Sequence, residues 1–353
     1  MGQTREGSDA DTGASSGRVA VLGAGSWGTA LAIHLARRGF DTMLWARSGE
    51  HVADMRAQGK NARYLPEAPF PPRLVPTDDM AAALRDAQLV VCAIPSHGMR
   101  DAMKHVAAIQ RDAAAPPYYL IAAKGIEVDS LASMHEVLQA ELPPGHRERV
   151  AALGGPSFAA EVAAGLPTTV VVAATEEPVR LAVQRMLSGA GVRAYVTDDV
   201  IGVELGGVLK NVIALAAGVG DGAGLGQNAR AGLITRGLAE ISRLAIKLGA
   251  HPATLSGLAG MGDLVLTCTG GLSRNRRVGI ALGQGRKLDE ILAEMGMVAE
   301  GVKNTLSAHR LAAREQVEMP LVATMHAILY GGLAVRDAVD LLMGRALRAE
   351  REW

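Results

Sequence analysis

The chain has 353 residues, enough for two domains of ordinary size and a full hydrophobic core. Its 36 basic and 36 acidic residues cancel to a formal net charge of zero, which excludes a global field that favours nucleic acid or an anionic membrane. Two cysteines, Cys92 and Cys268, and the lack of any sequence cluster with metal-ligand spacing indicate a reducing, cytoplasmic setting and no bound metal.

Residues 1–17 are polar and rich in glycine, serine, aspartate and threonine, and we expect a disordered tail rather than a secretory signal. Glu6 stands where a myristoylation motif needs serine or threonine. No run reaches the roughly 18 apolar residues that a membrane span needs. We therefore predict no integral membrane segment, a first domain over 18–200 and a second over 201–353.

The most informative stretch starts at residue 18, where the apolar run 19–22 meets Gly-Ala-Gly-Ser-Trp-Gly at 23–28 and an alanine-rich helical segment follows. Strand, glycine turn and helix in that order are the context that a dinucleotide-binding fingerprint requires. Gly23 permits the tight turn, Gly25 lets the backbone approach a pyrophosphate, and Gly28 lets the helix pack closely on the strand. A glycine turn in an unrelated α/β protein is the alternative.

Up to about residue 200, strand-like and helix-like stretches alternate. Several strands are continuous apolar runs, as in parallel strands covered on both faces. The predicted strands are 19–22, 42–45, 89–94, 118–122, 150–153 and 168–173, with helical patterns such as 80–87 and 130–141 between them. This alternation predicts an α/β Rossmann domain with a doubly wound, mainly parallel sheet that binds ligands at the carboxyl ends of its strands.

Three side chains near predicted strand ends are candidate ligands. Arg47 follows the second strand, about 20 residues beyond the glycine turn, where an acidic residue would bind the ribose of NAD and an arginine pairs with the 2′-phosphate of NADP. Lys124 follows the strand at 118–122 and can donate to a substrate or a nicotinamide. Tyr64 contacts the cofactor or anchors its loop. The alternatives are a solvated surface arginine and a surface lysine.

After Asp199 the β-branched runs give way to long helical patterns, which predict an all-α second domain. The predicted helices are 202–218, 229–248, 276–283, 288–294 and 302–314. A glycine-rich stretch at 218–226 interrupts two of them. It is compatible with close helix packing or a loop, and equally with a flexible wall of an active cleft.

The apolar segment 204–211 carries one lysine, Lys210, which would be costly to bury unpaired. Lys210 therefore faces water, pairs with an acid or lines a site. In a site, desolvation would lower its pKa and suit it to general-base work on a hydroxyl. Asp263 is a candidate partner or an acceptor for a substrate hydroxyl, and Thr267 is a weaker candidate beside it.

The segment 257–277 concentrates glycines, hydroxyls and cations in an otherwise apolar region. Ser273 is placed as the N-cap of the helix that follows. Arg274, Asn275 and the free backbone N–H groups would then converge on an anion such as a phosphate monoester. An ordinary capped, basic helix start is the alternative.

With these segments, the chain resembles the bacterial NAD(P)-dependent glycerol-3-phosphate dehydrogenases from about residue 18 to about residue 335. The resemblance rests on GAGSWGTA at 23–30, KGI at 124–126, GPSFAAE at 155–161, the segment 204–211, GMGD at 260–263, SRN at 273–275 and EG at 300–301. It implies a Rossmann domain and a helical domain with the active site between them. It also implies reversible hydride transfer between NAD(P)H and dihydroxyacetone phosphate, giving sn-glycerol 3-phosphate for phospholipid synthesis.

Carried over residue by residue, the resemblance implies Lys210 as the general acid/base. It implies substrate contacts from Lys124, Gly155, Ser157, Lys210, Asp263, Ser273, Arg274 and Asn275. It implies contacts to NADPH or NADP, with NADH or NAD as the other option, from Ser26, Trp27, Arg47, Tyr64, Lys124, Ala159, Arg274, Val298 and Glu300, beside Gly23, Gly25 and Gly28 of the turn. A homodimer is compatible with the sequence, which does not fix the oligomeric state.

Two other functions stay open from the residues alone. A related two-domain reductase acting on a β-hydroxyacid or on ketopantoate would bind a carboxylate instead of a phosphate. A non-catalytic NADPH-sensing protein would keep the glycine turn but need neither Lys210 nor Asp263. The cations and hydroxyls at 273–275 and the two lysines favour the phosphorylated substrate.

Overall fold

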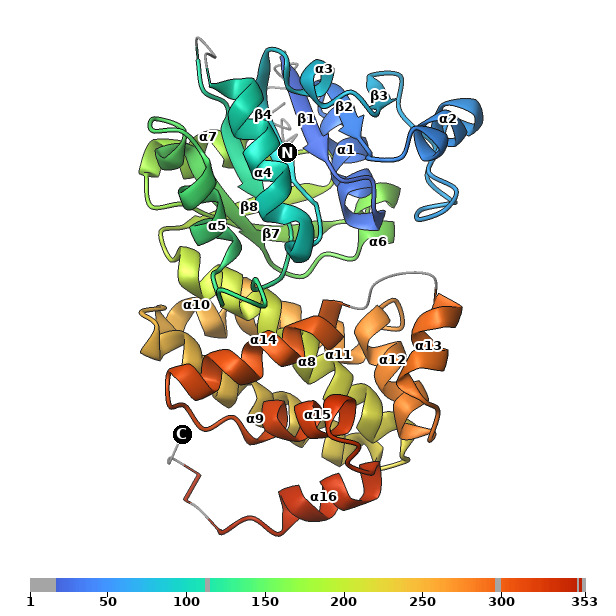
Figure 1. The fold of residues 1–353 in the computed structure, drawn as a ribbon, viewed down its shortest axis with the longest axis vertical. Helices are drawn as coiled ribbons and strands as arrows, with labels where there is room; N and C mark the ends of the chain where they lie inside the picture. Colours follow the sequence, from blue (N-terminus) through green and yellow to red (C-terminus); the bar gives the residue numbers. More distant parts are fainter. Residues whose placement is uncertain (1–16, 112–114, 296–299, 348, 351–353) are drawn as a thin grey trace, which may run out of the picture.

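The computed structural model describes residues 17–111, 115–295, 300–347 and 349–350. Val298 and the predicted tail, apart from Gly17, lie outside the described residues. The earlier part of the described chain forms a sheet with helices on both faces, and the later part is helical. Figure 1 shows the sheet part above the helical part.

Eight strands of the described chain form one sheet in the order β3-β2-β1-β4-β5-β6-β7-β8. They are β1 (Arg18–Leu22), β2 (Asp41–Trp45), β3 (Leu74–Thr77), β4 (Ala87–Cys92), β5 (Tyr118–Ile121), β6 (Val150–Gly154), β7 (Thr168–Ala173) and β8 (Val192–Thr197). Neighbouring strands pair in parallel except β6 and β7, which are antiparallel. The strand order reverses between β1 and β4, and such a switch point is where sheets of this kind bind ligands.

The predicted doubly wound, mainly parallel sheet is confirmed. The six predicted strands correspond to β1, β2, β4, β5, β6 and β7, with ends that shift by no more than two residues. β3 and β8, which form the two edges of the sheet, are not among the predicted strands.

Alternating side chains of the strands pack against helices on opposite faces. In β1, Val19 and Val21 join one buried cluster, whereas Ala20 and Leu22 join the other. The first cluster includes side chains of α1 (Ser26–Arg37), α2 (Gly49–Gln58), α6 (Ala159–Ala164) and α7 (Glu177–Leu187). The second includes side chains of α3 (Met80–Leu84), α4 (Ser96–Gln110) and α5 (Met134–Glu141). Two-sided burial explains why the central strands read as continuous apolar runs.

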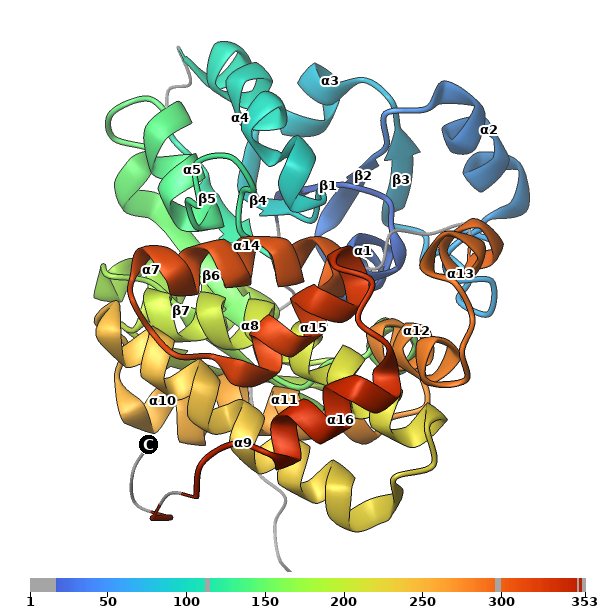
Figure 2. The same ribbon diagram turned by 60° about the horizontal axis from the view of Figure 1, so that its bottom comes forward.

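The helical part packs around α8 (Val200–Gly222). The other helices are α9 (Gly226–Lys247), α10 (Pro252–Ser256), α11 (Asp263–Thr269), α12 (Arg274–Gly283), α13 (Leu288–Met295), α14 (Glu300–Arg314), α15 (Pro320–Tyr330) and α16 (Val335–Met343). By length and average composition α8 could cross a membrane, but 89% of its apolar window is buried inside the structure. Figure 2 shows α8 lying among α9, α14 and α15, where it forms the core of this part.

Gly218 and Gly222, in the first part of the glycine-rich stretch at 218–226, serve close helix packing, whereas Gly224 and Gly226, with φ +74° and +82°, shape the turn between α8 and α9. A β-carbon on Gly218 would lie 2.2 Å from the carbonyl oxygen of Arg276, and one on Gly279 would lie 2.2 Å from the carbonyl oxygen of Leu215. Helices α8 and α12 therefore touch backbone to backbone. Helix α8 also continues through Gly222, beyond its predicted end at residue 218. The packing interpretation is confirmed.

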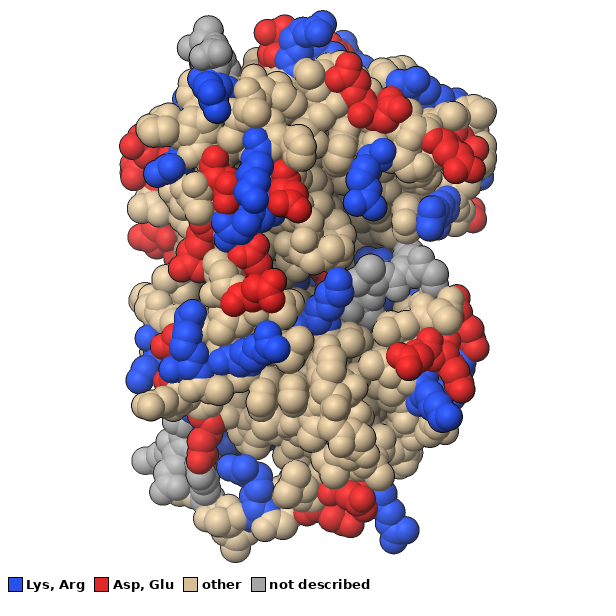
Figure 3. All heavy atoms as spheres, in the orientation of Figure 1, with Lys and Arg blue, Asp and Glu red and all other residues tan. Residues whose placement is uncertain are grey.

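Charged and thiol groups follow the expectations from composition. Figure 3 shows basic and acidic side chains interspersed over one face, without a broad area of a single sign, in keeping with the zero formal charge. Cys92 in β4 and Cys268 in α11 are both free and buried. Burial raises the pKa of each thiol to about 12, so neither is a ready thiolate.

Candidate active site

A cavity of about 1320 Å³ lies between the carboxyl ends of the strands and the helical part. The predicted site residues that line it are Gly23, Gly25, Ser26, Trp27, Gly28, Arg47, Tyr64, Lys124, Ser157, Ala159, Lys210, Ser273, Arg274, Asn275 and Glu300. Gly155 and Asp263 are absent from this lining, and Val298 falls outside the described residues. Residues far apart in the sequence thus meet around one space, which the sequence alone could not place.

The glycine turn between β1 and α1 has the geometry that the sequence predicts. Gly23 has φ +112°, and a β-carbon there would lie 2.6 Å from the carbonyl oxygen of Ala93. A β-carbon on Gly28 would lie 1.9 Å from the carbonyl oxygen of Gly23. At Gly25, by contrast, no heavy atom lies within 4 Å of where a β-carbon would stand. The turn is therefore closed on the protein side and open on the cavity side, as a cradle for a pyrophosphate must be.

Helix α1 also leaves donors toward this cavity. Its N-cap is Gly25, and no side chain caps it, so the first N–H groups of α1 have no partner of that kind. The indole Nε1 of Trp27 is buried and has no hydrogen-bond partner in the described part of the chain. These donors and the open side of Gly25 fit a bound dinucleotide.

Asn61 supports the turn from outside, and the sequence analysis missed it. Its buried Nδ2 donates to the carbonyl oxygen of Ala24 at 2.9 Å and to Oγ1 of Thr29 at 2.8 Å. This amide ties the loop that carries Tyr64 to the glycine turn. The only sequence signal was a polar residue in the same loop as Tyr64.

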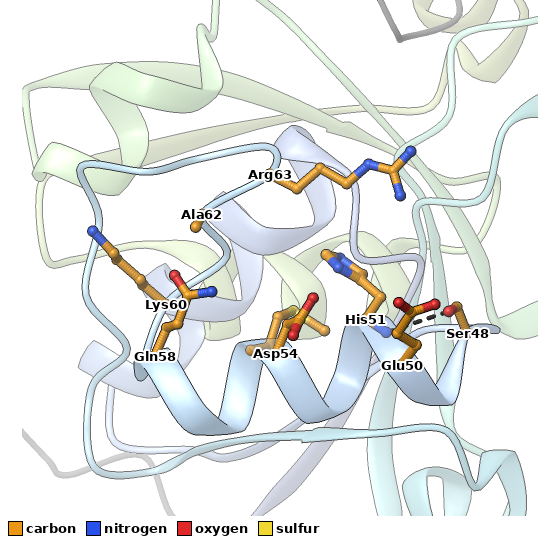
Figure 4. A pocket seen from close by; sticks show the side chains of 9 residues that line it. Ser48, Glu50, His51, Asp54, Gln58, Lys60, Ala62 and Arg63 are labelled. Atoms are coloured by element: carbon orange, nitrogen blue, oxygen red, sulfur yellow. Dashed lines mark hydrogen bonds between the residues drawn. The ribbon is translucent and has the colours of Figure 1, made fainter.

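The end of the cavity beside β2 is polar. Arg47 is exposed, and Tyr64 is half-buried with its ring edge-on to that of His51, at 5.6 Å between centroids. A second cavity of about 160 Å³ beside α2 shares Ser48, His51 and Arg63 with the large one. Figure 4 shows the His51 ring and Arg63 on the same side of α2. Tyr64 therefore both lines the cavity and packs its loop onto α2.

At the other end of the cavity one carboxylate holds two lysines. Lys210 Nζ, on α8, donates to Asp263 Oδ1 and, at 2.9 Å, to Oγ1 of Thr267. Lys124 Nζ, beyond β5, donates to Asp263 Oδ2 at 2.8 Å. The side chains of Lys210, Lys124 and Asp263 are 8%, 15% and 1% exposed. The predicted pairing of Lys210 with Asp263 is confirmed, and the pairing of Lys124 with the same carboxylate is an addition.

A π-helical segment, Leu258–Gly262, precedes Asp263 and sets its position at the start of α11. The N–H of Gly262 donates to the carbonyl oxygen of Gly257, five residues earlier, at 3.0 Å. Such wide helical turns are rare in proteins, and those that occur are often found at functional sites. Here the turn places the buried carboxylate of Asp263 between Lys210 on α8 and Lys124 beyond β5.

Burial and neighbouring charges shift the pKa values of Lys210, Asp263 and Glu300. Burial lowers the pKa of Lys210 to about 7, because a desolvated ammonium is unfavourable; Asp263 opposes this shift and the Lys124 charge adds to it. Burial alone would raise the pKa of Asp263, but the charges of Lys124 and Lys210 outweigh it and the pKa is lowered. Burial raises the pKa of Glu300. Lys210 can therefore gain and lose a proton near neutral pH.

The start of α12 forms the third side of the site. Ser273 is buried, and its Oγ accepts from the N–H of Arg276 at 3.2 Å, which confirms it as the N-cap. Asn275 Nδ2 donates to Asn211 Oδ1 at 2.9 Å, and its Oδ1 accepts from the N–H of Gly301 at 3.1 Å. These two bonds orient the Asn275 amide. Asn211 was missed as a site residue because its partner lies 64 positions away.

Ser157, by its Oγ, donates to the carbonyl oxygen of Gly155 at 3.0 Å and reaches the cavity beyond β6. Gly155 itself has φ +99° and turns the chain there. Within the described residues no group of three or more His, Cys, Asp or Glu side chains is arranged to hold a metal. The arrangement thus joins a phosphate cradle at one end to a titratable lysine and a capped helix start at the other.

The chain is similar to known proteins over both its sheet part and its helical part. Residues 18–179 match the family model for the N-terminus of NAD-dependent glycerol-3-phosphate dehydrogenase, and residues 199–340 match the model for its C-terminus. A protein of Citrifermentans bemidjiense is 51% identical over 334 residues, 94% of this chain and 98% of that protein. One of Geobacter sulfurreducens is 50% identical over 335 residues, 95% of this chain and 99% of that protein. Both are named glycerol-3-phosphate dehydrogenase with NAD(P)+.

The fold is also similar to a solved structure. A glycerol-3-phosphate dehydrogenase from Coxiella burnetii superposes with a TM-score of 0.88 at 42% sequence identity. The match covers 94% of this chain and 99% of that one. The likeness therefore extends through the sheet part and the helical part alike.

Proposed function

Because the chain belongs to the NAD-dependent glycerol-3-phosphate dehydrogenase family, it is an NAD(P)-dependent oxidoreductase, and we propose that it reduces dihydroxyacetone phosphate reversibly to sn-glycerol 3-phosphate in this cavity. One observation carries the assignment of roles. Lys210 and Lys124 share the carboxylate of Asp263, and both lysines line the same cavity as the glycine turn. A proton donor and a dinucleotide cradle on one cavity suit reduction of a carbonyl.

Lys210 is the general acid in the direction of reduction. When bound, a reduced nicotinamide cofactor would supply the hydride for the carbonyl carbon. The carbonyl oxygen gains negative charge as this happens, and Lys210 Nζ gives it a proton. Asp263 and Thr267 aim that ammonium, and Lys124 adds a positive charge that stabilises the developing alkoxide. In the direction of oxidation, neutral Lys210 takes the proton back.

The substrate phosphate lies at the start of α12. Ser273, Arg274 and Asn275 stand at the N-terminus of that helix, and Ser157 faces the same cavity. Backbone N–H groups and a guanidinium at a helix N-terminus favour a dianion over a neutral hydroxymethyl group. Lys124 and Gly155 complete the predicted substrate contacts.

A bound dinucleotide would be held on its pyrophosphate side by Gly23, Gly25, Gly28, Ser26 and Trp27. Arg47 and Tyr64 would contact its adenosine side, and Lys124, Ala159, Arg274 and Glu300 its nicotinamide side. Val298, which lies outside the described residues, stays a predicted cofactor contact. An exposed arginine after β2 supports a preference for NADPH over NADH.

We further propose a boundary between a cofactor domain over 18–200 and a helical substrate domain over 201–353, a homodimer, a cytoplasmic location and a role in phospholipid synthesis. The start of α8 at Val200 and the two family models, which leave a gap between 179 and 199, support the boundary. Two free, buried cysteines support a reducing compartment.

Loss of NADPH absorbance on mixing the protein with dihydroxyacetone phosphate tests the function. We expect turnover with this substrate and far less with unphosphorylated dihydroxyacetone or ketopantoate. Turnover with ketopantoate instead would identify the carboxylate-binding alternative. NADPH binding without turnover of any of the three would identify the sensing protein.

Lys210→Ala tests the assignment of the proton donor. We expect kcat to fall by roughly 10²-fold or more, the range of general acid–base catalysis, while NADPH binding stays normal. Lys247→Ala, at an exposed lysine at the end of α9, is the matched control and should leave kcat unchanged. Wild-type kcat in Lys210→Ala would contradict the assignment.

A further inference from the structure

Helix α14 is joined by a row of hydrogen bonds to the segment 124–128, which follows β5 in the sheet part. Asn304 Nδ2 donates to the carbonyl oxygen of Lys124 at 2.9 Å, and Ser307 Oγ to that of Ile126 at 3.2 Å. Arg310 Nη1 reaches the carbonyl oxygen of residue 128 at 3.4 Å. The three donors lie three positions apart and therefore share one face of the helix, and the three acceptors are every second carbonyl of the segment. One face of α14 thus holds three alternate carbonyls of segment 124–128.

The other side of this segment is held by the sheet part. Arg100, on α4, donates to the two carboxylate oxygens of Glu127 at 2.8 and 2.7 Å, and to Glu141 at 2.5 Å. Glu127 lies between the second and third carbonyls of this row. Segment 124–128 is therefore held on both sides. Arg100 binds the side chain of Glu127 on one side, and side chains of α14 bind backbone carbonyls on the other.

Helix α14 also starts inside the cavity. Glu300 lines the cavity, and the next residue, Gly301, donates its N–H to the amide oxygen of Asn275 at 3.1 Å. A β-carbon on Gly301 would lie 2.7 Å from that amide oxygen. Within its first five residues α14 touches the cofactor side, the substrate side and, through Asn304, the backbone of Lys124.

Lys124 needs such a tether because glycine follows it. Gly125 has no side chain to restrict the backbone, and a β-carbon there would lie 2.4 Å from Ser96. Asn304 is 1% exposed, so its bond to the Lys124 carbonyl is shielded from water. Freeing that carbonyl would let the Lys124 backbone rotate and carry its ammonium away from Asp263.

We propose that α14 is a positioning helix and that Asn304 is the positioning residue that fixes the Lys124 backbone, so that its ammonium meets Asp263 beside Lys210. The inference rests on the proposed substrate contact of Lys124. Asn304 touches neither substrate nor cofactor in this scheme; it acts through Lys124.

Asn304→Ala tests the proposal. We expect kcat/KM for dihydroxyacetone phosphate to fall about ten-fold to a hundred-fold, the cost of a small misplacement of a site group. Thr305→Val is the matched control, because Thr305 is buried beside Asn304 and its hydroxyl donates to the carbonyl oxygen of Gly301 within the helix. The control should stay within about two-fold of wild type. Ser307→Ala, one step further from Lys124, should lose less than Asn304→Ala.

A double-mutant cycle separates positioning from general damage. Lys124→Met should itself lose activity, and adding Asn304→Ala to it should cost little more, since the tethered group is gone. If Lys124→Met is fully active, the proposed role of Lys124 fails. If Lys124→Met is impaired and adding Asn304→Ala lowers its activity by as much as Asn304→Ala lowers that of the wild type, only the positioning role is wrong.

The pH profile supplies a reading that a purely structural residue would not move. The charged groups near Lys210 are Asp263 on α11, Lys124 beyond β5, and Glu300 and Arg274, which interact across the cavity. Displacing the Lys124 charge removes one influence that lowers the Lys210 pKa. In Asn304→Ala the limb of kcat/KM near neutral pH should therefore shift to higher pH, and an unshifted limb would overturn the proposal. If the alanine variant does not fold, Asn304→Ser undergoes the same cycle and profile.

Discussion

Asp263 is the residue on which both site lysines depend. Two ammonium groups close together repel each other, and burial penalises each of them. The carboxylate between them keeps the cluster together, and its own lowered pKa means that it stays ionised through the working pH range. Burial lowers the pKa of Lys210 to about 7, so this lysine can change its protonation state near neutral pH.

The two directions of the reaction should respond oppositely to pH. Reduction needs protonated Lys210, so its kcat/KM should be level below pH 7 and fall above it. Oxidation of glycerol 3-phosphate needs neutral Lys210, so its kcat/KM should rise through the same range. Initial rates in both directions across this range check the prediction. Parallel profiles would show that Lys210 does not carry the proton.

Arg47 should decide the choice of cofactor. Arg47→Asp replaces a partner of the 2′-phosphate with a group that repels it, so activity with NADPH should fall while activity with NADH is kept or improved. Lys60→Asp makes the same change of charge beside the smaller cavity and serves as the control. Ratios of kcat/KM for the two cofactors give the readout. Equal losses with both would assign Arg47 to structure or to the adenine.

At this scale the sequence predicted the groups that do chemistry better than the groups that hold them. Lys210 and Asp263 could be found because burying a charge in an apolar segment costs free energy unless the charge is paired or lines a site. Asn61 and Asn304 could not, because an amide that donates to a distant carbonyl has no local signature. Asn304 and Lys124 are 180 positions apart in the chain.

Helix α12 is the element that brings an anion site to the proton donor. Its glycine contact with α8 sets Ser273 and Arg274 beside the face that carries Lys210. The closeness of the two backbones leaves no room for a side chain between them. The stripe of glycines that looked like a loop signal is therefore what places the start of α12.

Arg274→Leu tests this anion site. Losing a bond to a charged group costs about 1.5–3 kcal/mol, or roughly ten- to a hundred-fold in kcat/KM. We expect that loss with dihydroxyacetone phosphate and a much smaller one with unphosphorylated dihydroxyacetone. NADPH affinity is measured alongside, because Arg274 is also placed near the cofactor. The same loss with both substrates and unchanged NADPH binding would contradict the phosphate contact.

Among the elements, the sequence predicted the covered strands and missed the edges. β3 is Leu-Val-Pro-Thr, and a proline argues against a central strand; at the edge it removes no needed donor. β8 alternates buried and exposed residues at its start, unlike the continuous apolar runs that marked the central strands. Whether a strand lies at the edge of the sheet depends on the topology of the whole sheet, and the local residue pattern does not carry that information.

At the scale of the whole molecule, buried carboxylates make stability depend on pH. Glu240, on α9, accepts from the N–H groups of Leu321 and Val322 at 2.7 and 3.2 Å and caps α15. Glu204, on α8, accepts from the N–H of His135 at 2.9 Å and ties the helical part to α5. Burial raises the pKa of each glutamate to about 7.

A raised pKa in the folded state means that the native protein binds protons that the unfolded chain, with a pKa near 4.5, has released. The associated stability is complete below that value and is lost as pH rises through 7. The melting temperature should therefore fall between about pH 4.5 and pH 7 and level off above pH 7. Glu240→Gln removes one of these groups and should make the decrease smaller. The free energy of unfolding should then change less with pH, by about 1.4 kcal/mol for each unit of pKa difference that the substitution removes. A variant that keeps the full wild-type slope would assign the dependence elsewhere.

The two buried thiols open a route to watching this enzyme move. Cys92 and Cys268 are the only cysteines in the sequence, and neither offers a reactive thiolate. A cysteine introduced at an exposed position on the sheet part and another on the helical part would be the points that react with maleimide dyes. The native background needs no cysteine to be removed first. Energy transfer between the two dyes would then report whether the cavity narrows when cofactor and substrate bind.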